Sequence, residues 1–237
     1  RDPYALIPEA ARAVAERLGT VRLRRDKPLP AFLDGFGWCT WDAFYREVSL
    51  EKVREGLESL RRAGASPRFL ILDDGWQSNR AMPTGELRLT AFAANGKFPG
   101  GLRTLVRMAR EEFGVGHVLA WHAIMGYWGG VDPAALPGYA VRDTIVRLAR
   151  ALATNAAVCD WQGWLSGVVE PADAARFLDD FHAAIRAEGV DGVKVDNQSS
   201  LAYLGDGHGG RVALFRAFRK GLEASVERHF GNTLINC

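Results

Sequence analysis

Two adjacent carboxylates follow a short apolar run in the stretch RFLILDDGWQS, residues 68–78. Residues 69–72 are expected to form a strand buried on both faces, as in a parallel sheet. Asp73 and Asp74 then lie where this strand leaves the core. Burial of two like charges side by side is costly unless something binds them. A solvated turn with a helix cap would also explain an isolated Asp-Asp pair, so its role depends on the rest of the chain.

A lysine and an aspartate in the stretch VKVD form a second candidate pair. Alternation along a strand places Lys194 and Asp196 on one face and the two valines on the other. An ammonium group beside the Asp196 carboxylate would favour its ionised form, which a nucleophile requires. We therefore expect Lys194 to lie beside Asp196, either in an active site or as a structural ion pair.

Tryptophans accompany these charged residues. An indole can cover the apolar C–H face of a sugar ring, while carboxylates accept hydrogen bonds from the sugar hydroxyls. Core packing is the usual role of tryptophan, but five of them near one end of the fold exceed what packing requires. This combination favours a carbohydrate ligand over other small molecules. The five tryptophans expected near strand ends or in the loops after them are Trp38, Trp41, Trp76, Trp121 and Trp128.

Histidines and glycines give weaker signals. The spacing of His117 and His122 places them on opposite faces of a strand, so a shared metal ion is not expected, and no other metal-ligand cluster is visible. His182 lies in an apolar helical pattern, which predicts a structural role. Residues 205–211 are glycine-rich and precede a helix, where an anion could bind, although a flexible turn explains them as well. They do not form a P-loop, because no Gly-Lys-Ser/Thr follows.

Strand and helix signals alternate from about residue 30 onward and must position these side chains. Strands are expected at residues 35–41, 68–74, 117–123, 191–196 and 232–236. Helices are expected at residues 8–19, 49–64, 100–114, 139–153, 172–188 and 211–230. The helix over 49–64 has Ser49 placed as its N-cap and Gly64 placed to end it.

This alternation predicts an α/β fold with a parallel sheet and right-handed crossovers. No G-x-G-x-x-G follows the first strand, which argues against a nucleotide-binding open sheet. Polar and aromatic residues gather at the carboxyl ends of the strands, where barrels build their active sites. We therefore expect a (β/α)8 TIM-type barrel, of which this chain contains about the first five βα units. Residues 1–30 are expected to form a helical lead-in, and 31–237 the N-terminal part of the catalytic barrel, with the remainder beyond residue 237.

Composition excludes several other classes of protein. The 237 residues are 48% hydrophobic and 24% charged, with a net charge of +2, which is typical of a globular protein and gives no support for nucleic-acid binding. No apolar run reaches membrane-spanning length. Cys39, Cys159 and Cys237 are odd in number and widely spaced, so neither a disulfide framework nor a zinc site is expected. A reducing, cytoplasmic location is predicted.

Six motifs in order resemble a known family. Together they span nearly the whole chain and are similar to the raffinose synthase and alkaline α-galactosidase (seed imbibition protein) group of glycoside hydrolase family 36. Each motif alone is modest, but the ordered set is specific. The motifs are DGFGWCTWDAFY, LILDDGWQS, NGKFPGGL, WHAIMGYWGGV, DGVKVD and GGRV.

The resemblance implies a catalytic (β/α)8 barrel that processes α-linked galactosyl groups with retention of configuration. It places the nucleophile at Asp196, the aspartate of the K-x-D motif. A galactose that shares the two neighbouring carboxylates would explain why they are tolerated together. The substrate-binding residues that the resemblance implies are Asp73, Asp74, Lys194, Trp41 and Trp121.

Two departures from the family pattern affect the expected mechanism. The family's acid/base aspartate lies in a Ser-Asp-Asp motif that does not occur before Cys237, so the acid/base is expected to be absent from this chain. Residues 1–237 alone are therefore predicted to be inactive. Asn197 and Gln198 stand where plant relatives tend to be apolar, which suggests altered recognition on the acceptor side and a bacterial or otherwise distant branch.

The resemblance implies an enzyme that acts on small-molecule carbohydrates without a cofactor. The expected reaction is either galactosyl transfer from galactinol to sucrose, which gives raffinose, or hydrolysis of α-galactosides. Both pass through a galactosyl-enzyme on Asp196 and differ only in the acceptor. A non-catalytic galactoside-binding homologue is the alternative. No nucleic-acid or membrane partner is expected.

Overall fold

The structure, a computed structural model, describes residues 2–148 and 162–237. The chain divides into two compact units, Arg1–Leu33 and Asp34–Cys237. Within the described residues, no helix combines the length and the apolar character that crossing a membrane would require. The larger unit contains all the residues singled out above for chemistry.

The smaller unit is built around one helix, α1 (Pro3–Leu18). Asp2 caps its start, because a side-chain oxygen of Asp2 accepts a hydrogen bond from the backbone N–H of Tyr4 at 2.9 Å. Gly19 ends it in the left-handed conformation, with a φ of 66°. The helix predicted at 8–19 is thus confirmed and begins one turn earlier. Two short 3₁₀ turns follow it, η1 (Arg24–Asp26) and η2 (Ala31–Asp34).

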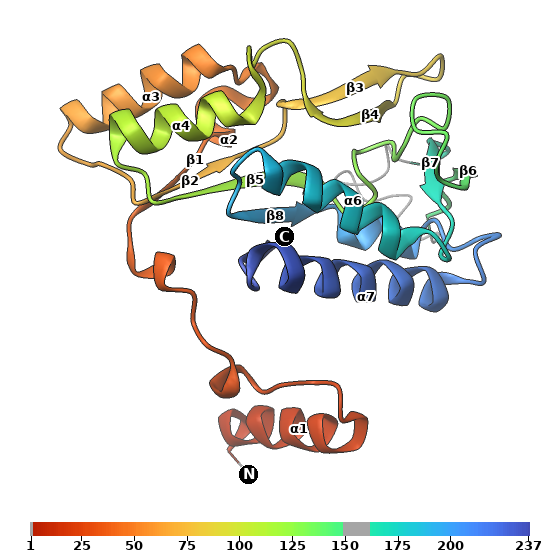
Figure 1. The fold of residues 1–237 in the computed structure, drawn as a ribbon. Coiled ribbons are helices and arrows are strands. Elements are labelled where there is room, and N and C mark those ends of the chain that lie inside the picture. The colour runs from red at the N-terminus through yellow and green to blue at the C-terminus, as the bar shows by residue number, and fades with distance from the viewer. Residues whose placement is uncertain (1, 149–161) are drawn as a thin grey trace. The chain divides into compact units, whose positions relative to one another are not determined.

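The larger unit contains a five-stranded parallel sheet in the order β1-β2-β5-β8-β9 (Figure 1). Each neighbouring pair is parallel, so the predicted parallel sheet is confirmed. Each strand forms within a stretch that the sequence pattern predicted. The strands are β1 (Gly37–Cys39), β2 (Phe69–Leu72), β5 (His117–Ala123), β8 (Gly192–Asp196) and β9 (Leu234–Asn236).

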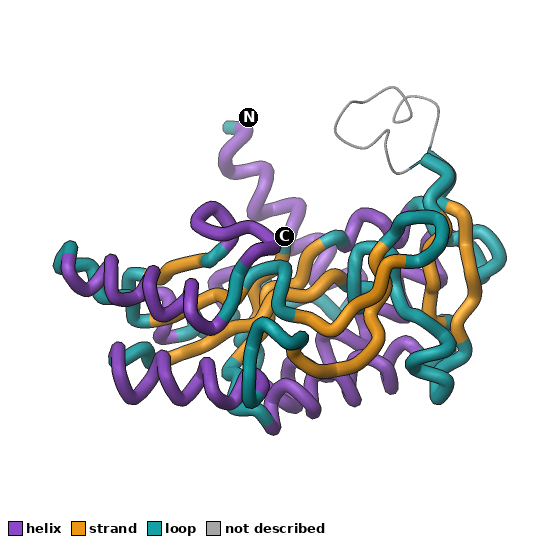
Figure 2. The backbone as a smooth tube through the Cα atoms, turned by 90° about the horizontal axis from the view of Figure 1, so that it is seen from above, coloured by secondary structure: helices purple, strands orange, loops and turns teal. Residues whose placement is uncertain are grey.

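Four helices connect these strands and complete the alternation that the sequence predicted. Figure 1 shows α3 beside α4 and α6 beside α7, and Figure 2 shows the same alternation of helices and strands from above. Shorter helical segments follow the ends of β1 and β8. The four connecting helices are α3 (Leu50–Arg62), α4 (Gly101–Phe113), α6 (Ala174–Ala187) and α7 (Arg211–Phe230), and the shorter segments are α2 (Trp41–Phe44), η3 (Tyr45–Glu47) and η5 (Gln198–Ala202).

Helix α3 illustrates how the sequence fixes these connections. The side chain of Ser49 accepts a hydrogen bond from the backbone N–H of Lys52 at 3.2 Å, so Ser49 is the predicted N-cap. Gly64, predicted to end the helix, has a φ of 75°. Gly56 leaves room for the indole of Trp38, because a Cβ at this position would lie 2.2 Å from that ring. Trp38 therefore faces α3 on the helix side of the sheet.

Two antiparallel strand pairs lie in the long connections, and the sequence pattern did not predict them. The carbonyl of Gly167 accepts a hydrogen bond from the N–H of Val131 at 2.8 Å. A Cβ at Gly167 would lie 2.0 Å from the Val131 carbonyl oxygen, so only glycine permits this approach. The pairs are β3 (Gln77–Ala81) with β4 (Leu87–Ala94), and β6 (Val141–Ile145) with β7 (Leu165–Val169).

The helix predicted over residues 139–153 is wrong in its first part, because Val141–Ile145 is the strand β6. Three of these five residues are β-branched, which favours a strand, and β7 supplies the antiparallel backbone partner. That partner lies some twenty residues further along the chain, beyond the reach of local periodicity. Residues 149–153, like Cys159, lie outside the described residues. Of the glycine-rich residues 205–211, residues 205–210 form a turn and Arg211 begins α7.

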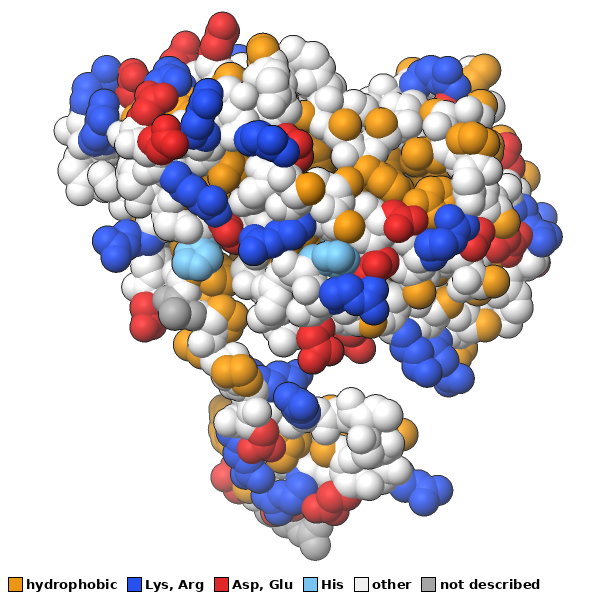
Figure 3. Space-filling view, in the orientation of Figure 1, with side chains coloured by type: hydrophobic (Ala, Val, Ile, Leu, Met, Phe, Trp, Pro, Cys, Tyr) orange, Lys and Arg blue, Asp and Glu red, His pale blue; other side chains and the backbone are white. Residues whose placement is uncertain are grey.

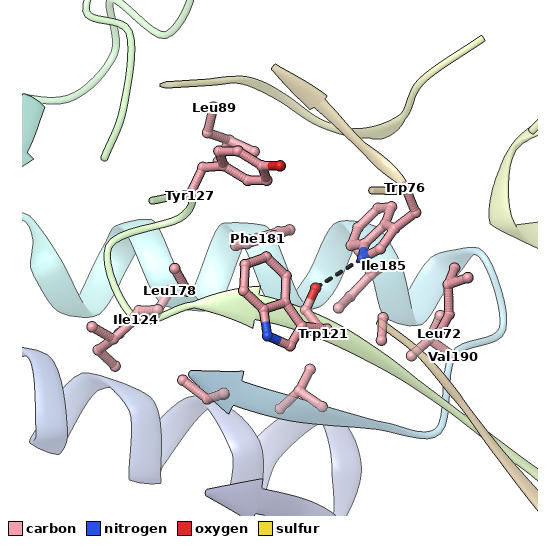
Figure 4. Close-up of a cluster of buried hydrophobic side chains, with 14 of the residues drawn as sticks. Leu72, Trp76, Leu89, Trp121, Ile124, Tyr127, Leu178, Phe181, Ile185 and Val190 are labelled. Carbon is pink, nitrogen blue, oxygen red and sulfur yellow. Dashed lines mark hydrogen bonds between the residues drawn. The ribbon is translucent and has the colours of Figure 1, made fainter. Parts of the chain in front are cut away.

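Buried apolar side chains join the sheet to its helices. Figure 4 shows part of this core, in which side chains of β2, β5 and α6 lie together. Close packing of this kind fixes the positions of the strand ends that carry the charged residues. The labelled members include Leu72, Trp121, Leu178, Phe181 and Ile185, each at most 1% exposed.

Two histidines are buried in contact between β5 and α6. The Nε2 atoms of His122 and His182 are 3.0 Å apart, and Nδ1 of His182 lies 2.8 Å from the hydroxyl of Ser225. Burial lowers the pKa of His122 to about 4. Burial, followed by the charge of His122, also lowers the pKa of His182. His182 is therefore part of the interior, as its apolar helical pattern predicted.

We expect this pair to make stability depend on pH. The unfolded chain protonates His122 near its ordinary pKa of 6.5, whereas the folded chain resists protonation until about pH 4. Stability is therefore full above pH 6.5 and is lost as pH falls toward 4, by at most roughly 3 kcal/mol for His122. The melting temperature of the full-length protein, measured between pH 8 and 4.5, should fall across this range.

The matched comparison is His182→Gln, which removes one of the two titrating rings. For each protein, the melting temperature at pH 8 serves as the reference, because these histidine rings are neutral at that pH in the folded and the unfolded chain. The fall in melting temperature between pH 8 and 4.5 should be smaller in this variant than in the wild type. An equal fall in both proteins would show that the histidine pair does not cause the pH dependence.

Candidate active site

Four charged side chains lie at the carboxyl ends of two strands of the parallel sheet. Asp73 and Asp74 directly follow β2, Lys194 and Asp196 belong to β8, and β5 lies between these strands. His122 of β5 points toward α6, whereas residues of opposite parity point away from the helices. Lys194 and Asp196 share a face, opposite two fully buried valines, as the alternation predicted.

Lys194 forms its ion pair with Asp73. Its Nζ donates to Oδ2 of Asp73 at 2.5 Å, and the thiol of Cys39 donates to the same oxygen at 3.1 Å. The backbone N–H of Asp74 donates to the other carboxylate oxygen at 3.0 Å. Burial alone would lower the pKa of Lys194, but the hydrogen bond and charge of Asp73 outweigh it and raise this pKa. The ammonium group thus compensates a carboxylate that is only 3% exposed.

The expectation that Lys194 would pair with Asp196 is therefore corrected. Among the described ion pairs, the partner of Lys194 is Asp73. Side chains two residues apart on a strand project in the same direction. Lys194 and Asp196 therefore share a face without forming an ion pair with each other. The long lysine side chain instead reaches across β5 to the more deeply buried carboxylate.

Cys39 is a site residue that the sequence analysis did not assign to the site. It is the last residue of β1, and its thiol lies against Asp73 and within 4.0 Å of the Lys194 ammonium. Burial, together with the nearby Asp73 carboxylate, raises the pKa of this thiol to about 11. The thiol therefore stays protonated at neutral pH and acts as a hydrogen-bond donor. Cys39 ends a strand and directly follows Trp38, which faces the helices, so alternation places the thiol on the opposite face. That position is the signal that could have identified it.

Asp74 is held by two hydrogen-bond donors and one ion-pair partner of its own. It accepts hydrogen bonds from the Tyr127 hydroxyl at 2.6 Å and from the Trp128 indole N–H at 2.8 Å. Nε of Arg46 lies 3.9 Å away. Burial raises the pKa of Asp74, and these hydrogen bonds and the Arg46 charge offset the rise only in part. The two adjacent carboxylates are thus tolerated because each has separate protein donors, which the expectation of a shared galactose did not include.

Asp196 is oriented at both carboxylate oxygens. Oδ1 accepts the backbone N–H of Asn197 at 2.6 Å, and Oδ2 accepts the indole N–H of Trp121 at 3.2 Å. The Asp196 side chain is only half-buried. A carboxylate that is fixed in direction and still accessible can attack an electrophilic carbon or accept a hydrogen bond from a ligand.

The five tryptophans differ in burial and in orientation, and most of them do not offer a ring face to a ligand. Trp76 is fully buried and donates its indole N–H to the Trp121 carbonyl at 2.8 Å (Figure 4). Trp121 is 1% exposed, so it supports the site through its hydrogen bond to Asp196 and does not present a ring face. Trp41 and Trp128 are half-buried and Trp38 faces α3, so the expected platform of five tryptophans is reduced to two.

The arrangement of the charged side chains gives less support for a metal ion or a strongly charged ligand. Within the described residues, no group of three or more His, Cys, Asp or Glu side chains is placed to hold a metal ion. On the face of the larger unit that Figure 3 shows, basic and acidic side chains lie interspersed. The charged cluster at the strand ends therefore suits a neutral ligand with many hydroxyl groups, which can donate to the carboxylates and accept from Lys194.

Comparison with known proteins identifies relatives of this chain. Residues 1–237 match the family described as raffinose synthase or seed imbibition protein Sip1. A protein of Arabidopsis thaliana named "Probable galactinol–sucrose galactosyltransferase 6" is 40% identical, across 100% of this chain and 34% of that protein. The galactinol–sucrose galactosyltransferase of Oryza sativa subsp. japonica is 38% identical, across 99% of this chain and 33% of that protein. The chain thus spans about a third of the length of these relatives.

A solved structure shows the same fold. A glycoside hydrolase family 36 α-galactosidase of Geobacillus stearothermophilus, in complex with stachyose, has a TM-score of 0.60 at 15% identity. The similarity covers 88% of this chain and 29% of that one. At this identity the comparison concerns the fold alone, whereas the family match extends over every residue of the sequence. The chain therefore belongs to the raffinose synthase or seed imbibition protein family.

Proposed function

We propose that this chain is part of the catalytic domain of a retaining enzyme that acts on α-galactosides. The observation that carries the proposal is Asp196, a half-buried carboxylate held at both oxygens beside the Asp73–Lys194 pair. The similarity to galactinol–sucrose galactosyltransferases supports the same substrate class. In this proposal Asp196 is the nucleophile, and Asp73, Asp74 and Lys194 bind the galactose hydroxyls.

The proposed reaction has two displacements. Asp196 attacks the anomeric carbon, the bond to the leaving oxygen breaks, and a galactosyl-enzyme forms. A second carboxyl group gives its proton to the leaving oxygen and then removes one from the incoming hydroxyl. We assign neither Asp73 nor Asp74 to this second role, because protein donors already occupy both.

We also propose that the full-length protein closes the sheet into an eight-stranded barrel. Within the described residues, β1 and β9 are the two edges of a five-stranded parallel sheet. Exposed strand edges invite further pairing, and closure removes them. The fold shared with a glycoside hydrolase family 36 α-galactosidase supports this architecture.

The substrate is tested with galactinol in the presence and absence of sucrose, using the full-length protein and chromatography of the products. We expect raffinose to form only when sucrose is present, as in a galactosyltransferase. Free galactose in both reactions would identify a hydrolase of the same class. Neither product from a folded protein would contradict the catalytic proposal and favour a galactoside-binding homologue.

A further inference from the structure

Asn197, the residue after Asp196, carries a buried oxygen without a hydrogen-bond partner. Its side chain is 7% exposed, and no described residue donates to its Oδ1. Buried polar atoms without partners are rare in folded proteins, because such an atom loses water and gains nothing in exchange. This oxygen can therefore accept a hydrogen bond from a donor outside the described residues.

The backbone holds Asn197 firmly in this position. It has a φ of 56° and a ψ of 30°, in the left-handed region that asparagine tolerates better than most residues. Its N–H donates to Asp196 at 2.6 Å, and its carbonyl accepts from the hydroxyl of Ser200 at 2.6 Å. The backbone of Asn197 is thus held by two short hydrogen bonds, one of them to the proposed nucleophile.

The side chain lines a small cavity beside the site. The space has room for about one water-sized group and is lined mainly by apolar atoms. One wall is Trp128, whose indole N–H binds Asp74. Trp128 and Trp164 are only half-buried, so the cavity borders the surface. Its lining includes Met125, Trp128, Trp164, Ser166, Asn197 and Ser200.

We propose that this cavity is a subsite for one hydroxyl-bearing carbon of the bound carbohydrate. The hydroxyl donates to Oδ1 of Asn197, while the carbon that carries it lies against the indoles of Trp128 and Trp164. An oxygen acceptor set among apolar atoms suits a group that is polar at its tip and apolar at its base. The inference rests on the proposed function and extends it with a specificity residue, Asn197.

Asn197→Gly in the full-length protein removes the amide and suits the positive φ, so the backbone can stay in place. We expect the KM for the carbohydrate to rise about two- to tenfold, as for loss of one neutral hydrogen bond, and by more than kcat falls. The matched control is Asn232→Gly. Asn232 also has a positive φ, 70°, but it is exposed and lies outside the cavity lining, so its KM should equal that of the wild type.

Separate KM measurements for galactinol and for sucrose show which of the two substrates carries the hydroxyl. A rise in the KM for galactinol alone places it on the galactosyl donor, and a rise in the KM for sucrose alone places it on the acceptor. Trp164→Leu provides a second variant. It removes the indole of Trp164 from the cavity wall and leaves Asn197 unchanged. It should raise the same KM, and it keeps the test decisive if Asn197→Gly does not fold.

Calorimetric binding of raffinose separates this inference from the proposed function. If the wild type binds without turnover, weaker binding by Asn197→Gly than by Asn232→Gly still supports the subsite and contradicts only the catalytic proposal. If the wild type turns over galactosides and neither cavity variant changes any KM, the subsite is wrong and the catalytic proposal stands. If the wild type neither binds nor turns over galactosides, both are wrong.

Discussion

Asp196→Ala in the full-length protein is expected to lower kcat on α-galactosides on the order of 10⁴-fold or more, because no other group can form the galactosyl-enzyme. The fold should persist, since Asp196 is half-buried and its removal leaves only two donors without their acceptor, the indole N–H of Trp121 on β5 and the backbone N–H of Asn197 after β8. Steady-state kinetics with an aryl α-galactoside, together with a melting curve, measure both effects.

A positioning role for Asp196 would also reduce the rate, so a second measurement separates the two roles. A small anion such as azide can enter the space that the carboxylate leaves and attack the anomeric carbon directly, with departure of the aryl oxygen. The product is then a β-galactosyl azide, whose formation requires that Asp196 normally occupies the attacking position. Asp206→Ala is the control, because Asp206 is exposed and should be dispensable. Wild-type kcat in Asp196→Ala would contradict the assignment.

The strands that carry the site could be predicted because each is a short apolar run that ends in polar residues. Asp73, Asp74 and Asp196 were found in this way, since the carboxyl ends of parallel strands meet at one edge of the sheet. Local periodicity is enough for that step, because both the buried run and its polar end lie within a few residues.

The partners of these carboxylates could not be predicted in the same way. The thiol of Cys39 and the hydroxyl of Tyr127 reach Asp73 and Asp74 from 34 and 53 residues away. Lys194 crosses from β8 to a strand that is not its neighbour, so alternation gave its face correctly and its partner wrongly. Side-chain length and tertiary packing decide such contacts, and neither is visible in a local pattern.

The same limit explains the error over residues 139–153. The strand β6 depends on antiparallel pairing with β7, whose residues lie far along the chain. The burial of Trp121 could not be predicted either, because its place at a strand end does not reveal the side chains that cover it. Predictions therefore held where one segment determines the outcome and were wrong where two distant segments do.

Lys194→Met is expected to reduce both stability and activity. The change leaves the Asp73 carboxylate, 3% exposed, without the ammonium that compensates it, and breaking such a pair costs about 3 kcal/mol. Activity falls as well, because the proposed galactose site loses its cation. The melting temperature and kcat/KM, both at pH 7, measure these effects.

The double variant Asp73→Asn with Lys194→Met decides whether the ion pair is the cause. With both charges removed, no buried charge is left uncompensated, so most of the lost stability should return. Activity should stay low, because the galactose hydroxyls still lack their charged partners. If the double variant were as unstable as Lys194→Met alone, the lysine would stabilise the fold through its aliphatic packing, and the Asp73–Lys194 pair would not be what allows a buried carboxylate at this strand end.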